Sequence, residues 1–341
     1  MSLQEKDVET TRDRDSFRSD VAGRDSVGRE LVETAHGLGV HSLDHFALTV
    51  PDLRKAQHFY ESFGLEVREE GDSLALYTFD HPHRWAMLFE AKTKQLRYLS
   101  FAAFTRDVGQ LKRHIQACGE ALLEPPEEFC SDGLWLRDPD GLWVEIRAAE
   151  KTSPDSKSIP EFQSSPPGQP GAPKRSQAPV VRPTRLGHCL MFTRSVPRTV
   201  SFYERVLGLR LSDHAGDDIA FMHGIHGSDH HLVAFARAEG PGLHHCSWDV
   251  HSFNDLGLGA EQMARQGYSA GWGLGRHVLG SNYFHYVRDP WGSHSEYSCD
   301  MDYIPAGARW RAGNHDGEDA FYVWGPKPPR DWTHNYEMDS R

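Results

Sequence analysis

Residues 43–67, LDHFALTVPDLRKAQHFYESFGLEV, and residues 186–211, LGHCLMFTRSVPRTVSFYERVLGLRL, are two versions of one pattern in a single chain. His45 matches His188, and the triplet Phe-Tyr-Glu follows each histidine at the same spacing. Self-similarity over this length is the mark of a repeated structural unit. The chain is therefore predicted to contain two similar domains.

The repetition continues downstream and brings a second histidine and a carboxylate into register. The matching stretches are RYLSF (97–101) with HHCSW (244–248), and RDPDGLWVEIR (137–147) with RDPWGSHSEYS (288–298). Tyr98 thereby falls over His245, and Glu145 falls over Glu296. The second copy offers two histidines and a glutamate where the first offers a histidine, a tyrosine and a glutamate.

Local patterns predict the same elements in both copies. Apolar residues at helical spacing predict one helix from Val196 to about Gly208 and another over 107–119. SNYFHYVRDPWG (281–292) has the alternation of a strand closed by an Asp-Pro-x-Gly turn, and SHSEYS (293–298) is its return strand. Each copy is read as two βαβββ modules. The expected fold is α+β, with two tandem domains whose mixed sheets curl around a central cavity.

Composition excludes several classes of protein. The 341 residues carry 37 basic and 49 acidic side chains, a net charge of −12, which disfavours nucleic acid or an anionic membrane as partner. No apolar run is long enough to span a bilayer, and the charged N-terminus does not resemble a signal peptide. Five cysteines without a C-x-x-C pair fit a reducing cytoplasm.

The domain boundaries follow from shifts in composition. Polar, weakly periodic residues open the chain, and a stretch rich in Pro, Ser and Gly separates the two copies. The expected segments are a flexible arm (1–40), an N-terminal domain with a decayed metal site (41–150), a linker (151–180), a catalytic domain (181–302) and a lid or tail (303–341).

A metal site is predicted in the second copy from His188, His245 and Glu296. Two imidazoles and one carboxylate form the facial triad that holds non-haem Fe(II) and leaves positions open for substrate and O2. A single strand histidine is more often structural than ligating. The internal comparison favours the complete set, and His45 and Glu145 are read as structural remnants.

The motifs RLGHCLMFT, HHLVAF, GLHHCSW and GLGRHVLGSNYFHYVRDPWGSHSEY resemble those of type I extradiol catechol dioxygenases, of the vicinal-oxygen-chelate superfamily, over residues 41–335. The resemblance selects the second histidine of each doubled pair, His245 as ligand and His231 as the acid–base group. It also marks His277 and Tyr286. Because neighbours on a strand face opposite ways, His244 and His230 are expected to turn away.

What the resemblance implies is ring cleavage of a catechol next to its hydroxyls, with both atoms of O2 inserted. Fe(II) is the expected cofactor and Mn(II) the alternative; a homo-oligomer is expected as well. The expected catalytic residues are His231, His277 and Tyr286. The expected substrate-binding residues are His277, Tyr286, Asn282 and Trp324. Alternatives are a glyoxalase-type isomerase, a hydroxyphenylpyruvate-dioxygenase-type enzyme and a non-catalytic ligand-binding protein of the same superfamily.

The aromatic tail bears on the substrate. In relatives such a tail folds over the active site, and Phe321, Tyr322 and Trp324 are candidates to line it. Relatives that use arylacetate catechols carry two arginines before the matching Trp-Gly, and this chain does not. A larger apolar catechol, similar to 2,3-dihydroxybiphenyl, is therefore expected, with Arg309 and Arg311 as the remaining candidates for a carboxylate contact.

Overall fold

The computed structural model describes residues 37–339 except 80, 130 and 163. Most of the expected arm, residues 1–36, lies outside the described residues. Its last residues pack firmly, since Val40 is fully buried and its N–H donates to the carbonyl of Leu207 at 2.9 Å. Among the described helices, none has the length and apolar character that a membrane span requires.

The first copy forms a seven-stranded sheet in the order β2-β3-β4-β1-β5-β7-β6. Its elements are β1 (Ser42–Val50), α2 (Leu53–Phe63), β2 (Glu66–Glu70), β3 (Ser73–Tyr77), β4 (Arg84–Glu90), β5 (Gln95–Ala103), α3 (Thr105–Ala117), the 3-10 turn η1 (Glu127–Phe129), β6 (Leu134–Arg137) and β7 (Trp143–Ala148). The segment between the copies holds one further 3-10 turn, η2 (Arg175–Gln177).

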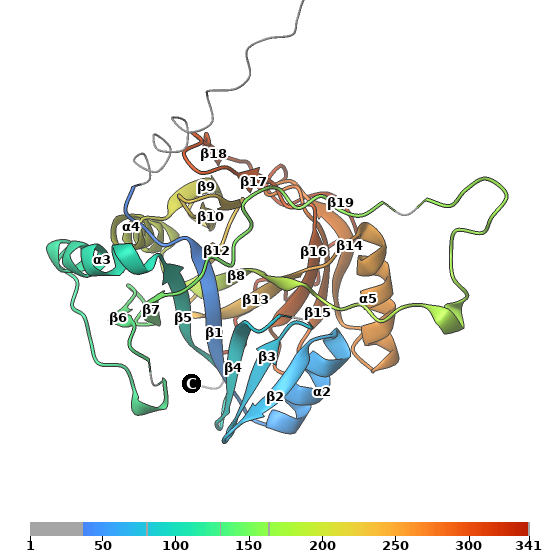
Figure 1. Cartoon of the computed structure of the whole chain (residues 1–341), viewed down its shortest axis with the longest axis horizontal. Helices are drawn as coiled ribbons and strands as arrows, with labels where there is room; N and C mark the ends of the chain where they lie inside the picture. The colour runs from blue at the N-terminus through green and yellow to red at the C-terminus, as the bar shows by residue number, and fades with distance from the viewer. Residues whose placement is uncertain (1–36, 80, 130, 163, 340–341) are drawn as a thin grey trace, which may run out of the picture. The chain divides into compact units, whose positions relative to one another are not determined.

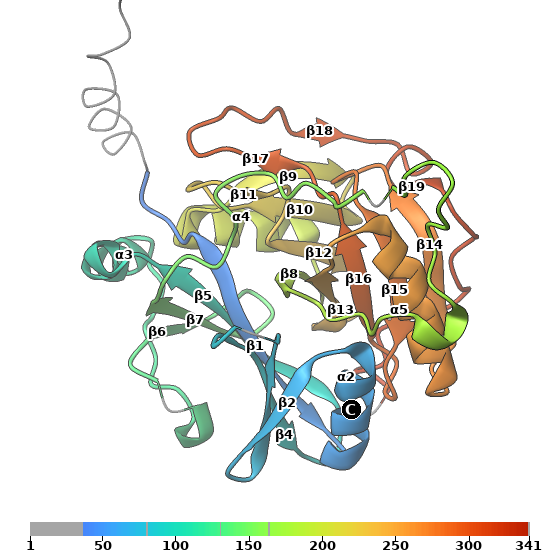
Figure 2. The ribbon, with the colours of Figure 1, turned by 45° about the vertical axis from the view of Figure 1, so that its right-hand side comes forward.

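The second copy forms a ten-stranded sheet in the order β18-β9-β10-β12-β8-β13-β16-β15-β14-β19, which curves around the centre of Figure 2. Its elements are β8 (Arg185–Thr193), α4 (Val196–Leu207), β9 (Arg210–Ala215), β10 (Ile219–His223), β12 (Val233–Arg237), β13 (Gly242–Asp249), α5 (Phe253–Arg265), β14 (Gly271–His277), β15 (Tyr283–Arg288), β16 (His294–Cys299), β18 (Gly313–Asn314) and β19 (Tyr322–Trp324). The short strands β11 (Ser228–Asp229) and β17 (Tyr303–Ile304) pair separately.

Equivalent strands pair in the same way in the two sheets, which confirms the predicted fold class. β1 is antiparallel to β5 and parallel to β4, as β8 is antiparallel to β13 and parallel to β12. The predicted hairpin of β15 and β16 forms, and α4 ends where Gly208 takes a left-handed conformation (φ 76°). The second module of the first copy has one strand fewer than expected. After α3, an isolated bridge from Leu123 to Trp135 stands in place of the first of the three strands that should follow the helix.

The two copies pack together through their helices, α2 beside α5 and α3 beside α4 (Figure 1). The ring of Phe63 stacks on Tyr297 with centroids 3.8 Å apart, and the Tyr297 hydroxyl donates to the Phe63 carbonyl. Buried residues of both copies form one continuous core. This packing leaves the concave face of the ten-stranded sheet to hold a site.

Candidate active site

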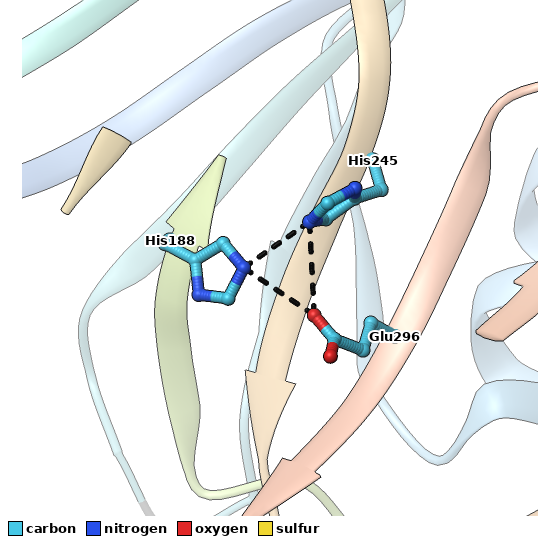
Figure 3. Close-up of side chains that lie close together, drawn as sticks. All are labelled: His188, His245 and Glu296. Carbon is cyan, nitrogen blue, oxygen red and sulfur yellow. Dashed lines mark hydrogen bonds and ion pairs between the residues drawn. The ribbon is translucent and has the colours of Figure 1, made fainter. Parts of the chain in front are cut away.

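Strand register brings the three predicted ligands together. His188 on β8 and Glu296 on β16 both lie opposite Ser247 of the intervening strand β13. His245 precedes Ser247 by two residues and therefore faces the same side of the sheet. The three side chains converge from three neighbouring strands (Figure 3).

The ligand atoms are close enough to share one ion. Nε2 of His188 lies 3.1 Å from Nε2 of His245, and Oε2 of Glu296 lies 3.3 Å and 3.7 Å from these two nitrogens. All three residues are buried, and among the described residues Oε2 has no hydrogen-bond partner. A buried carboxylate oxygen facing two imidazole nitrogens fits a divalent cation.

The charges of these groups suit a cation. Burial, together with the adjacent histidines, lowers the pKa of His245 well below its ordinary value, which keeps a lone pair on the ring. Burial opposes ionisation of Glu296, yet the neighbouring His188 holds its pKa below the ordinary value. The site therefore combines a carboxylate with a neutral imidazole.

The corresponding place in the first copy is closed. His45 and Glu145 both lie opposite Ser100, but the Tyr98 hydroxyl is 3.0 Å from Nε2 of His45. Glu145 accepts a hydrogen bond from Ser100 at 2.5 Å. Trp135 and Phe129 pack against the Tyr98 ring, so aromatic side chains fill the space.

The expectation that His244 turns away from the site is wrong. The register between β8 and β13 shifts between Leu243 and His245, and His244 is the extra residue of this β-bulge. A bulge breaks the alternation of faces, so His244 is buried and lines the same cavity as His245. Its Nδ1 is 2.7 Å from Nδ1 of His245, and its Nε2 donates to the carbonyl of Trp332.

His231 lies beside the ligands, with its ring centroid 4.1 Å from that of His188. It lines the cavity, whereas His230 does not. His230 is fully buried, with Nδ1 3.1 Å from Nδ1 of His231 and Nε2 2.8 Å from Oδ2 of Asp213. The pair therefore divides as expected, although His230 is enclosed by protein rather than solvated.

The remaining polar candidates adjoin the triad. Tyr286 lies opposite Glu296 in the sheet, and its hydroxyl is 2.9 Å from Nε2 of His277. Asn282 is buried and donates to Oε1 of Glu296 at 3.2 Å and to Ser298 at 2.9 Å. The structure thus places Asn282 where it orients the Glu296 carboxylate.

Above the triad lies a cavity of about 860 Å³ with predominantly apolar walls. The apolar side chains in these walls include Leu190, Phe192, Phe221, Leu279, Phe321 and Trp332, and the charged residues Asp218, Arg237, Asp316 and Arg330 line the cavity as well. Two of them, Phe321 and Trp332, come from the tail. Trp324 and Tyr322 are not among the described residues that line the cavity; Trp324 is 42% exposed and packs on Phe253 and Tyr283. Edge strand β19 turns it outward.

Sequence reasoning missed Trp332 and Asp213. Trp332 packs against His244 and Tyr286 with centroids 4.6 and 4.7 Å apart, and Asp213 contacts His230 from strand β9. Neither residue belongs to a motif near the site. Their positions depend on how the tail and β9 dock, for which the local sequence carried no signal.

Comparisons with known proteins identify a family and a relative that resemble this chain over most of its length. Residues 42–146 and 185–297 match the family described as the Glyoxalase/Bleomycin resistance protein/Dioxygenase superfamily. Metapyrocatechase 2 of Cupriavidus necator is 47% identical over 323 residues, which cover 95% of this chain and 99% of that protein.

Two solved structures share the fold at lower identity. An extradiol ring-cleaving dioxygenase from B. fuscum matches with a TM-score of 0.69 and 21% identity, over 87% of this chain and 82% of that one. A Mn(II)-bound glyoxalase from Novosphingobium aromaticivorans matches with a TM-score of 0.66 and 23% identity, over 86% and 93%. At these identities the likeness concerns the fold alone.

Proposed function

The chain belongs to the Glyoxalase/Bleomycin resistance protein/Dioxygenase superfamily, and from this membership we propose that it is an extradiol ring-cleaving dioxygenase acting on catechols. The observation that carries the proposal is the buried triad of His188, His245 and Glu296, complete in one copy and facing a cavity that holds His231, His277 and Tyr286. The relative with 47% identity over nearly the whole chain, a metapyrocatechase by name, supports the same reaction.

Fe(II) is the proposed ion, with Mn(II) as the alternative, because two imidazoles and one carboxylate suit both. When bound, such an ion lowers the pKa of a coordinated catechol hydroxyl and passes electron density from the ring to O2. The chain would supply the three ligands, His188, His245 and Glu296, and the cavity in front of them.

Three side chains carry the proposed proton and orientation chemistry. His277 and Tyr286, joined by a hydrogen bond, would hold the substrate oxygen and the charge that develops during ring opening. His231, beside His188 at the cavity wall, would accept and return the proton. Ring opening beside the hydroxyls yields a semialdehyde or vinylogous keto acid, which is yellow.

The proposed substrate is a catechol with a sizeable apolar substituent, similar to 2,3-dihydroxybiphenyl. Aromatic and aliphatic walls favour such a group, since they gain by excluding water from it. Arg309 and Arg311 are not among the described residues that line the cavity, so neither supports a carboxylate contact there. A homo-oligomer in the cytoplasm is proposed as the working form. The four described cysteines form no disulfide with one another, which fits the reducing conditions of that compartment.

A glyoxalase-type isomerase is the second candidate, because a glyoxalase shares the fold. Such an enzyme would draw metal ligands from both copies. The contact of Tyr98 with His45 closes the first copy to an ion and argues against that arrangement.

Oxygen consumption tests the proposal. Protein loaded anaerobically with Fe(II) is mixed with 2,3-dihydroxybiphenyl, 3-methylcatechol or homoprotocatechuate in the presence of ¹⁸O2. We expect one O2 consumed per catechol, a yellow product that contains both labelled atoms, and the highest kcat/KM with 2,3-dihydroxybiphenyl. Absence of a yellow product with every catechol would overturn the assignment.

A further inference from the structure

A chain of hydrogen bonds runs from His231 away from the cavity. Nδ1 of His231 lies 3.1 Å from Nδ1 of His230, and Nε2 of His230 lies 2.8 Å from Oδ2 of Asp213. All three residues are at most 6% exposed, so water does not compete for these contacts. The other ring nitrogen of His231, Nε2, remains available to the cavity.

The Asp213 carboxylate decides which group donates and which accepts in each of these hydrogen bonds. Asp213 also accepts hydrogen bonds from the Gly313 N–H at 2.7 Å, from His315 at 2.8 Å and from Trp310 at 3.3 Å. Burial opposes its ionisation, but the hydrogen bonds from His230, His315 and the Gly313 N–H lower the pKa of Asp213 to about 2. An ionised carboxylate has no proton to give, so Nε2 of His230 must be the donor.

The proton on His230 then decides the state of its neighbour. A neutral imidazole with its proton on Nε2 has a lone pair on Nδ1. That lone pair accepts the proton carried by Nδ1 of His231. Since a neutral ring holds one proton, Nε2 of His231 keeps its lone pair.

We propose that Asp213 and His230 are positioning residues that hold His231 with its proton on Nδ1 and its lone pair on Nε2. This inference rests on the proposed role of His231 as the group that accepts a proton from the substrate. A base needs a lone pair aimed at the proton that it takes. The carboxylate sets this tautomer through an intervening histidine.

The second doubled histidine repeats the arrangement. The Trp332 carbonyl accepts from Nε2 of His244, and Nδ1 of His244 contacts Nδ1 of His245. There too an oxygen acceptor leaves Nε2 of the inner histidine free, in this case for the metal. The first histidine of each pair therefore lies between an oxygen acceptor and Nδ1 of the second histidine.

The variant Asp213→Asn should reverse the direction of the hydrogen bonds that join residue 213, His230 and His231. With Oδ1 still accepting from Gly313, the new amide replaces Oδ2 and donates to His230. His230 must then carry its proton on Nδ1, which moves the proton of His231 onto Nε2. Trp310→Phe is the matched control. It removes another hydrogen-bond donor to Oδ2 of Asp213 but leaves the carboxylate, and hence the tautomers of His230 and His231, unchanged. The variant also removes the hydrogen bond from the Trp310 indole to the Ser212 carbonyl.

The test combines kinetics with NMR of ring nitrogens. For Asp213→Asn we expect kcat to fall by about 100- to 10,000-fold, the range of lost general base catalysis. Bound iron and the KM for the catechol should stay within about threefold, and Trp310→Phe should keep kcat within about twofold. Equal losses in the two variants, or a loss of iron in Asp213→Asn, would overturn the proposal.

The NMR measurement does not depend on catalytic turnover. In ¹⁵N-labelled protein loaded with diamagnetic Zn²⁺, the His231 signals are assigned by their loss in His231→Gln. We expect the proton on Nδ1 in the wild-type protein and on Nε2 in Asp213→Asn. A proton on Nε2 of wild-type His231 would overturn the inference even if Asp213→Asn does not fold. The expected tautomer in a protein that fails to cleave catechols would instead count against the proposed function alone.

Discussion

Nδ1 of His244 lies 2.7 Å from Nδ1 of His245, although the two residues are neighbours on one strand. The β-bulge between Leu243 and His245 makes this contact possible, and the Trp332 carbonyl completes it on the far side. A metal-binding imidazole is oriented by the partner of its other nitrogen. The tail of the chain is thus connected through one histidine to His245, the proposed metal ligand.

His244→Phe should therefore weaken metal binding by about 10- to 100-fold, because His245 loses the acceptor for its Nδ1 proton. The measurement is competitive titration of the apoprotein with Fe(II) or Zn²⁺ against a chelator. His294→Phe is the control, since both ring nitrogens of buried His294 lack a hydrogen-bond partner among the described residues. Equal weakening by the two variants would exclude this role for His244.

Asn282→Ala separates two possible roles of Asn282. The amide donates to Oε1 of Glu296, so its loss should weaken metal binding by about 10-fold or more. The KM for the catechol, measured at saturating metal, should change by less than about threefold. A raised KM with unchanged metal affinity would show instead that Asn282 contacts the substrate.

Lys94 and Glu337 form a buried ion pair of 2.6 Å that joins the first copy to the tail. Glu337 also accepts from the N–H groups of Leu96 and Leu243. Lys94→Met leaves a buried carboxylate without its cation and should reduce the free energy of unfolding by about 3–5 kcal/mol. Lys55→Met, which breaks an exposed pair with Asp52, should cost less than about 1 kcal/mol in the same urea titration.

Asp213 should add a recognisable pH dependence to stability. Its pKa in the folded protein is about 2, below the ordinary value of 3.8, so its contribution is complete above about pH 4. As the pH falls from 4 towards 2 the carboxylate takes up a proton and this contribution is lost. The difference in urea midpoint between wild type and Asp213→Asn should therefore narrow over that interval, and a constant difference would contradict the assignment.

Much of the fold was readable from the repeated stretches. Matching His45 with His188 aligned the two copies, and the alignment then placed Tyr98 over His245 as the structure does. The predicted hairpin formed as expected, because β15 pairs regularly with β16 and Tyr286 lies opposite Glu296. Short-range pattern was sufficient wherever strands follow regular geometry.

Short-range sequence pattern was not sufficient where strand geometry is irregular or where contacts join distant segments. The bulge at His244 cannot be read from alternation. The contacts of Trp332 and Asp213 depend on how the tail docks, and Trp324 was assigned to the cavity although β19 directs it outward. These positions are set by tertiary packing between segments distant in sequence.

Metal content of paired histidine variants tests the central assignment most directly, since His188 and His45 occupy equivalent positions on β8 and β1. Wild-type protein should bind one Fe(II) per chain. His188→Gln should lose the iron and the yellow product together, whereas His45→Gln should retain both. Iron retained by His188→Gln, or lost equally from His45→Gln, would contradict a single metal centre in the second copy.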